Sequence, residues 1–440
     1  MSVEKNPAQG IGREGGLRPK APCPGSLRAL RVLLVLSLLV SHLVLQFAMR
    51  RLGENPHIIF SDGVGYFSYF HSLLFDRDLD FRNEYKRLLS YSPAVLESWL
   101  RDSLPDGRPR NIYAVGPAVF WAPFYLAGHA AALLRPGESG WPADGLSFPY
   151  QLAVVLGSFL YGLAGTLLLE RLLRSRFPPE VAFAAAWSSL LATPVIYYVL
   201  FEPSMAHATD FFAVAAFLTL AERCRRRARP TLWGSAFLGL AVGVLFLVRW
   251  INALFLAWAA LAVWRAGKEG GSGPAALARW TIALAAGFWV GSLPQLLVWK
   301  GLFGAFFVVP GGEGYFQLDW DGFWGTLFSA RNGLYIWTPL AAAGTAGLFV
   351  YRGWGRPERM VFFALFLAAV CVNALVHDWW GGHSFGMRRL IGFFPFLAFG
   401  LAEVIRRAGS RPLAVHLFLA GLVAWNGYLM VARKLVWWPN

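Results

Sequence analysis

The chain has 440 residues, of which 56% are hydrophobic and only 15% are charged. With 20 tryptophans and a mean hydropathy of +0.47, it carries too much apolar surface for one soluble core, whereas a helical bundle can leave such surface in lipid. The three cysteines (Cys23, Cys224 and Cys371) lie far apart and offer neither a disulfide framework nor a metal-ligand spacing. The composition therefore predicts an all-α polytopic membrane protein.

Apolar runs follow one another along most of the chain. Because a spanning helix needs roughly 20 mostly apolar residues, the shorter runs must extend into their flanks. The first run starts beside Arg28 and Arg31 and has no clear small-residue cleavage site, so we predict a retained anchor rather than a signal peptide. The runs lie at residues 29–49, 149–169, 181–200, 211–221, 232–248, 251–264, 280–299, 333–350, 361–376, 390–405 and 413–431.

A further apolar segment, 113–134, is interrupted by Pro117 and Pro123, and its placement decides the topology. If it lies in the membrane interface and the N-terminus is cytoplasmic, the whole net charge of +15 falls on the inner side and the outer side nets zero, as the positive-inside rule requires. This distribution makes the basic charge an orientation signal and excludes nucleic acid as the partner. The inner basic segments are then "RLLRSR" (171–176), "RCRRRAR" (223–229), "WRAGKEG" (264–270), "YRGWGRPER" (351–359) and "RRAGSR" (406–411).

These assignments predict a multi-pass protein of the cell (inner) membrane with about eleven transmembrane helices. Residues 1–28 form a basic cytoplasmic tail, and residues 29–440 form one transmembrane domain whose C-terminus lies outside. Within it, residues 51–148 form a large outer loop with in-plane interfacial helices. From Tyr66 the apolar positions of this loop repeat at helical spacing, with Ser68, His71 and Ser72 between them, which predicts an amphipathic helix at the lipid interface.

The outer loop opens with "FSDGVGYFSYFHSLLFDRDLDF" (60–81), in which Ser61 or Asp62 stands where that helix would begin. One interpretation of Asp62 is a helix N-cap. The other is a carboxylate held at the mouth of the bundle, facing a substrate in the membrane. Both roles are compatible only if one carboxylate oxygen stays free.

Basic side chains gather at the predicted outer ends of several helices. Arg388 and Arg389 in "HDWWGGHSFGMRRL" (377–390) lie on the side that the positive-inside rule disfavours for arginine, which weakens snorkelling as their explanation. The glycines of this segment let backbone N–H groups approach an anion, so we predict anion binding there. Arg249, Lys300 and Arg331 are each compatible with a structural role, but together they would add to a cationic rim.

The segment "FEPSMAHATD" (201–210) brings Glu202, His207 and Asp210 into one outer turn. Without a second histidine or a closer spacing, hydrogen bonding to sugar hydroxyls or helix capping is favoured over metal binding. We assign Tyr66, Glu202, His207 and His383 to substrate binding and predict no metal and no cofactor.

Six segments together resemble a C-type (GT-C) membrane glycosyltransferase of the bacterial branch related to protein O-mannosyltransferases and lipid A aminoarabinose transferases. The resemblance covers about residues 29–405, and it rests on the order of the set. The segments are "SDGVGYFSYF", "GPAVFWAPFYLAGH", "LFEPSMAH", "LLVWKGLFG", "LFSARNGLYIWTPL" and "WWGGHSFGMRRLIGFFPFLAFG".

The resemblance implies inverting transfer of a sugar from a polyprenyl-phosphate donor to a lipid, glycan or protein hydroxyl on the outer face. Asp62 would be the base, and Arg388 would bind the donor phosphate. Many relatives carry an acidic pair where this chain has Asp62 followed by Gly63, so the second acid is open. The candidates for it are Asp76, Asp78 and Asp80. The "SFGMRRL" segment also lacks a Pro-Arg-Tyr sequence, although Arg388 keeps the basic position.

The alternative class is a transporter or flippase of lipid-linked sugars. Such proteins usually carry ionisable residues near mid-membrane and often show repeated halves, and this sequence shows neither. A structural scaffold would not explain the paired charges of the outer face.

Overall fold

The computed structural model describes residues 24–52, 57–134, 141–227, 230–317, 319–409 and 411–435. These residues form eighteen α-helices and three short π or 3-10 segments. The β structure among them is limited to two isolated β-bridges. The all-α prediction is therefore confirmed over the described residues. Most of the tail predicted at 1–28 lies outside them.

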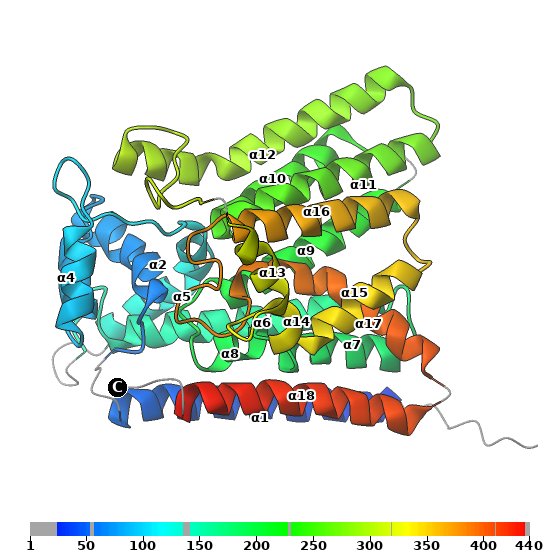
Figure 1. Ribbon diagram of the computed structural model, residues 1–440. Helices are drawn as coiled ribbons and strands as arrows, with labels where there is room; N and C mark the ends of the chain where they lie inside the picture. The colour runs from blue at the N-terminus through cyan, green and yellow to red at the C-terminus, as the bar shows by residue number, and fades with distance from the viewer. Residues whose placement is uncertain are drawn as a thin grey trace, which may run out of the picture.

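The long helices run roughly side by side (Figure 1). The helices α1 and α18 form an outer layer along one side of the bundle, and α10, α11, α12 and α16 lie along the other (Figure 1). The bundle consists of α1 (Pro24–Leu52), α6 (Phe148–Leu173), α7 (Pro179–Leu191), α8 (Val195–Leu200), α9 (His207–Arg225), α10 (Leu232–Val248), η2 (Trp250–Phe255), α11 (Leu256–Glu269), α12 (Pro274–Phe303), α14 (Leu334–Trp337), α15 (Pro339–Val350), α16 (Arg356–Ala374), η3 (Arg388–Phe393), α17 (Phe394–Arg407) and α18 (Pro412–Leu435).

Six of the described helices are long and apolar enough to cross a membrane, which indicates a multi-pass membrane protein. Length and composition thus assign fewer crossings than the eleven predicted. Other predicted spans are shorter or broken helices, such as α7 and α8, which are separated near Pro194. The six are Gly25–Arg51, Phe148–Leu173, Trp250–Glu269, Pro274–Phe303, Arg356–Ala374 and Pro412–Arg433.

Glycine faces bring two helix pairs into backbone contact. On α10, a methyl group at Gly239 would lie 1.9 Å from the Leu284 carbonyl oxygen of α12. On α12, a methyl group at Gly287 would lie 1.9 Å from the Ala236 carbonyl oxygen of α10. Small residues four apart on facing helices allow such an approach, and in lipid the resulting van der Waals contact drives association. The sequence pattern of apolar runs does not reveal which glycines face each other.

The same arrangement in α15 and α17 yields a stability prediction. A Cβ atom at Gly400 would lie 1.8 Å from the Gly344 carbonyl oxygen, so Gly400→Val must push the two backbones apart. We expect the free energy of unfolding to fall by about 1–3 kcal/mol or more, the range typical of overpacked interiors. Thermal unfolding of the detergent-purified variant would measure it. Gly421→Val on α18 is the control, because its Cβ meets no atom within 4 Å; equal stability of the two variants would contradict the packing argument.

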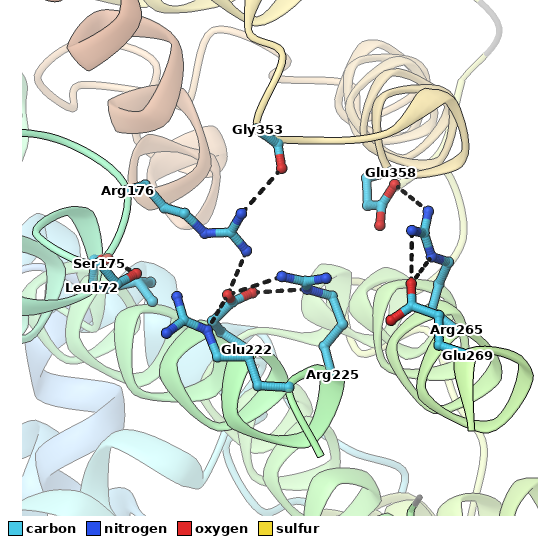
Figure 2. Close-up of polar contacts among 10 residues, drawn as sticks. Leu172, Ser175, Arg176, Glu222, Arg225, Arg265, Glu269, Gly353 and Glu358 are labelled. Carbon is cyan, nitrogen blue, oxygen red and sulfur yellow. Dashed lines mark hydrogen bonds and ion pairs between the residues drawn. The ribbon is translucent and has the colours of Figure 1, made fainter. Parts of the chain in front are cut away.

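At one end of the bundle the basic segments are joined by ion pairs (Figure 2). Glu222 near the end of α9 accepts hydrogen bonds from Arg176 and Arg225, and Arg265 on α11 donates to Glu358 on α16 at 3.1 Å. These contacts gather four of the five basic segments that the sequence analysis assigned to the inner side. The short turns between helices are thereby tied to each other.

The opposite end carries a second core, formed mainly by the segment between α1 and α6. Its helices are α2 (Asp62–His71), α3 (Arg82–Leu88), α4 (Pro93–Arg101) and α5 (Gly116–Leu133), with a π segment η1 (Ser72–Asp76) after α2. The aromatic cluster of α2, α3 and α5 packs against the start of α6, and α2 and α4 lie together at this end (Figure 1). Another short helix, α13 (Trp320–Phe328), contacts α16.

The amphipathic helix lies where we predicted it, but the serines expected on its exposed polar side are buried. Helix α2 begins at Asp62 as expected, yet Ser68 and the following Ser72 are fully buried. Both hydroxyls donate to backbone carbonyl groups, Ser68 to Val64 and Ser72 to Asp78, so they need no water. A serine hydroxyl can donate its hydrogen bond to a nearby backbone carbonyl group, and the helical spacing of the sequence does not show when it does so.

Candidate functional site

Helix α2 starts at the wall of a cavity, and two glycines let it pack closely there. A Cβ atom at Gly63 would lie 2.3 Å from the Ser204 hydroxyl oxygen, and one at Gly65 would lie 2.0 Å from the Tyr113 ring. Ser61 occupies the N-cap position but its side chain makes no cap hydrogen bond. Asp62 is therefore not the N-cap, and its carboxylate faces the cavity instead.

Asp62 is held by two partners from distant parts of the chain. Its Oδ2 accepts a hydrogen bond from Arg388 Nη1 at 2.6 Å, and its Oδ1 accepts one from the Tyr113 hydroxyl at 3.0 Å. Burial, reinforced by the charge of Asp62, raises the pKa of Tyr113 well above its usual range, so the phenol stays a donor. Asp62 is 23% and Arg388 14% exposed at the side chain, so the pair is shielded from bulk water but reachable.

The cavity has a volume of about 750 Å³, within the range of small-molecule sites. Its polar wall holds three arginines and two carboxylates, so the lining itself carries one more positive than negative charge. The same wall contains aromatic and apolar side chains from α2, α10, η2 and α16. The charged members are Asp62, Asp378, Arg249, Arg388 and Arg389.

The loop before α17 places Arg388 and Arg389 by means of an asparagine. Asn332, at a backbone φ of 68°, donates to the Trp380 carbonyl at 2.9 Å and accepts from the Gly386 N–H at 3.1 Å. Gly386 has a φ of 62°, a conformation that favours glycine. Arg389 is fixed by Asp378, at 2.5 Å from its carboxylate and 2.7 Å from its carbonyl oxygen. The two neighbouring arginines therefore have different partners, and Arg388 alone faces Asp62.

Arg249 joins the cavity from the end of α10. Its Nη1 lies 2.8 Å from His207 Nδ1, and since guanidinium can only donate, the imidazole accepts there and is neutral. Its Nε lies 4.0 Å from the Oδ2 atom of Asp210, whose other oxygen accepts from Asn252 at 2.7 Å. Asp210, fully buried, thus acts behind the wall as a counter-charge.

The structure brings together some of the predicted site residues and separates others. Asp62, Tyr66, His207 and three arginines line the cavity. The expected cationic rim of five is reduced, because Lys300 and Arg331 are exposed and lie outside the cavity wall. Lys300 donates to the Gly304 carbonyl, and Arg331 packs over the Trp380 ring.

Two of the four residues assigned to substrate lie elsewhere. Glu202 is buried and accepts a hydrogen bond from the Tyr197 hydroxyl at 2.9 Å. His383 is exposed, and its carbonyl oxygen accepts from Arg433. The histidine of this loop that lines the cavity is His377. In a glycine-rich loop the sequence does not show which side chain turns inward.

Sequence reasoning missed Tyr113, Asp378 and Asn332. Tyr113 starts the apolar segment 113–134, and a polar aromatic at the edge of such a segment is a signal that could have been used. Asp378 and Asn332 lie beside residues that the sequence analysis singled out, but nothing in their spacing indicates a partner.

The candidates for a second acid lie away from Asp62. Asp76, Asp78 and Asp80 line a separate cleft of about 400 Å³. Among the described residues, one group has three metal-ligand types converging, namely His71, Asp76 and Glu84, and it too lies outside the Asp62 cavity.

The cavity combines a proton acceptor with fixed cations at one site. A carboxylate within hydrogen-bond reach of a hydroxyl can accept its proton, and arginines fixed by other groups can stabilise a developing negative charge. The arrangement is therefore chemically competent for attack of a hydroxyl on a carbon atom that bears a phosphate leaving group. Comparison of the chain with protein-family models, curated proteins and solved structures finds no match in any of the three.

Proposed function

We propose that the protein is a membrane glycosyltransferase that moves a sugar from a polyprenyl-phosphate donor to an acceptor hydroxyl. The observation that carries the proposal is the contact between Asp62 and Arg388, which are 326 residues apart in the chain and meet in the wall of one cavity that three arginines line. A volume of about 750 Å³ accommodates a sugar phosphate, while the prenyl chain would extend into lipid.

In this proposal Asp62 accepts the proton of the acceptor hydroxyl as that oxygen attacks the anomeric carbon with inversion. The bond between the anomeric carbon and the phosphate oxygen breaks, and its electron pair leaves with the polyprenyl phosphate. Arg388 and Arg249 stabilise the charge that the phosphate gains. Before the donor binds, Arg388 holds Asp62; the donor phosphate would take over Arg388 and release a carboxylate oxygen for the acceptor.

A direct test is consumption of the donor by purified protein. We expect the protein in detergent to release polyprenyl phosphate from one member of a panel of radiolabelled polyprenyl-phosphate sugars, and the Asp62→Asn variant to do so far more slowly. Movement of intact lipid-linked sugars across proteoliposomes, with no donor consumed by any acceptor class, would instead favour a transporter.

We further propose that the bundle crosses the membrane eleven times. Helix α9 supports this topology, because it runs from His207 at the cavity to Arg225 in the ion-pair network. Its 19 residues span about 28 Å, which is close to the thickness of the hydrocarbon core. The proposed crossings are α1, α6, α7 with α8, α9, α10, η2 with α11, α12, α14 with α15, α16, η3 with α17, and α18.

Helix α5 would lie along the outer surface rather than cross. A Cβ at Gly116, its first residue, would meet Leu247 at the end of α10, and one at Gly128 would meet Pro149 and Tyr150 at the start of α6. Both parts of α5 thus contact helix ends on the same side of the bundle, beside the outer loop and the cavity. These contacts support an in-plane placement of α5. The basic network would then be cytoplasmic and the cavity extracytoplasmic.

This topology predicts the labelling of two introduced cysteines. In a background in which the native cysteines are replaced, Ser90→Cys, at an exposed site after α3, should react with a membrane-impermeant thiol reagent added to intact cells. Ser272→Cys, in the turn between α11 and α12, should react only after the membrane is opened. Labelling of Ser272→Cys but not of Ser90→Cys in intact cells would reverse the proposed orientation.

A further inference from the structure

Three potential ligand groups converge where α2 ends, remote from the Asp62 cavity. His71 is the last residue of α2, Asp76 ends the π segment η1, and Glu84 lies in α3. The His71 Nδ1 atom is 2.9 Å from Glu84 Oε1 and 3.0 Å from Asp76 Oδ2. Three elements thus point one nitrogen and two carboxylate oxygens at a common point, all within 4.8 Å of one another.

The burial of Glu84 indicates that a positive charge is still needed there. Its side chain is 0% exposed, and its Oε2 atom has no hydrogen-bond partner. A carboxylate oxygen buried without a partner costs free energy that a single neighbouring imidazole does not offset. A cation bound between the two acids would satisfy the free oxygen.

The surroundings have the features of a supported metal site. Asn83 donates to Asp76 Oδ2 at 2.7 Å and so orients that carboxylate, and the His71 ring is stacked on Phe75 with centroids 5.2 Å apart. Asp76 is 30% exposed at the side chain and also lines the open cleft of about 400 Å³, which gives an ion a route from solvent. A π segment directly after a helix is itself a conformation often retained for function.

We propose that His71, Asp76 and Glu84 bind one divalent transition-metal ion, Zn²⁺ or Mn²⁺, that clamps the end of α2 to α3. Imidazole together with carboxylates suits these ions, whereas Ca²⁺ and Mg²⁺ prefer oxygen ligands only. Water would complete the coordination from the cleft. The role is structural: the ion fixes the helix whose first residue is Asp62, and the inference does not rest on the glycosyltransferase proposal.

The test uses full-length protein purified in detergent with a tag that contains no histidine. After treatment with EDTA and removal of the chelator, the protein is incubated with Zn²⁺, Mn²⁺ or Ca²⁺ and desalted, and bound metal is measured by plasma mass spectrometry. We expect about one Zn²⁺ or Mn²⁺ per chain, no retained Ca²⁺, and a rise in Tm of about 2 °C or more, since ligand binding stabilises the native state.

The Glu84→Gln and Asp76→Asn variants should lose the bound metal and the rise in Tm. Asp80→Asn is the matched control, because Asp80 lines the same cleft outside the ligand group and should keep both. Absence of metal from the wild-type protein, or equal metal in wild type and Glu84→Gln, would overturn the proposal and leave only an ion pair of protonated His71. The proposed function is tested separately by donor consumption, so failure of the metal proposal would leave that test unchanged.

Discussion

Replacing Asp62 by asparagine should lower the rate of sugar transfer by roughly 10²–10⁴-fold, the range typical of a lost general base. The amide has nearly the same shape, and its oxygen can still accept the Tyr113 hydroxyl hydrogen bond. The change removes the charge that pairs with Arg388, but both side chains are partly exposed, so water can satisfy the guanidinium. Single-turnover transfer by purified protein at saturating donor would isolate the chemical step.

The Asp62→Asn variant should also fold and bind donor. We expect its Tm to stay near that of the wild type and its donor affinity to be equal or higher, because Asp62 no longer competes with the phosphate for Arg388. Asp106→Asn is the control, since Asp106 is an exposed acid between α4 and α5 that pairs with Arg108 and lies outside the cavity wall. Transfer by Asp62→Asn at the rate of the Asp106→Asn control would exclude Asp62 as the base.

Replacing Arg388 by alanine should weaken donor binding about 10- to 100-fold, which corresponds to the loss of a hydrogen bond to a charged group. The rate of transfer should fall as well, because the same guanidinium would stabilise the leaving phosphate. Arg388→Lys should restore binding only in part, since an ammonium group cannot reproduce the planar two-pronged contact with a phosphate. Equilibrium binding of a radiolabelled donor, measured beside transfer, separates the two effects.

Arg331→Ala provides the matched control for Arg388. Arg331 is exposed and packs over Trp380 outside the cavity wall, so its removal should leave donor affinity within about twofold of the wild type. If both alanine variants bind donor as tightly as the wild type does, Arg388 serves only as the partner of Asp62. If both lose affinity equally, the phosphate lies nearer the exposed loop than the cavity.

Much of the architecture was predictable from local sequence properties. The apolar runs predicted helices because, in lipid, backbone polar groups must be satisfied within each segment, so length and composition suffice to identify candidates. The same runs did not establish how many helices cross the membrane. Broken helices such as α7 and α8 are each shorter than the length that a crossing needs. The start of a helix near Asp62 was also predictable, because apolar side chains at helical spacing follow this polar residue.

The sequence by itself determined that this is an all-α, multi-pass membrane protein, and it placed a carboxylate and a pair of arginines among the candidates for chemistry. Only the tertiary structure decided that Asp62 pairs with Arg388, that Lys300 and Arg331 lie outside the cavity wall, and that His71 meets Asp76 and Glu84. The physical reason is that hydropathy and helical period are properties of one segment. The meeting of side chains depends on which glycines allow close helix packing and on how loops such as 377–390 turn, and neither is encoded in the periodicity of a single segment.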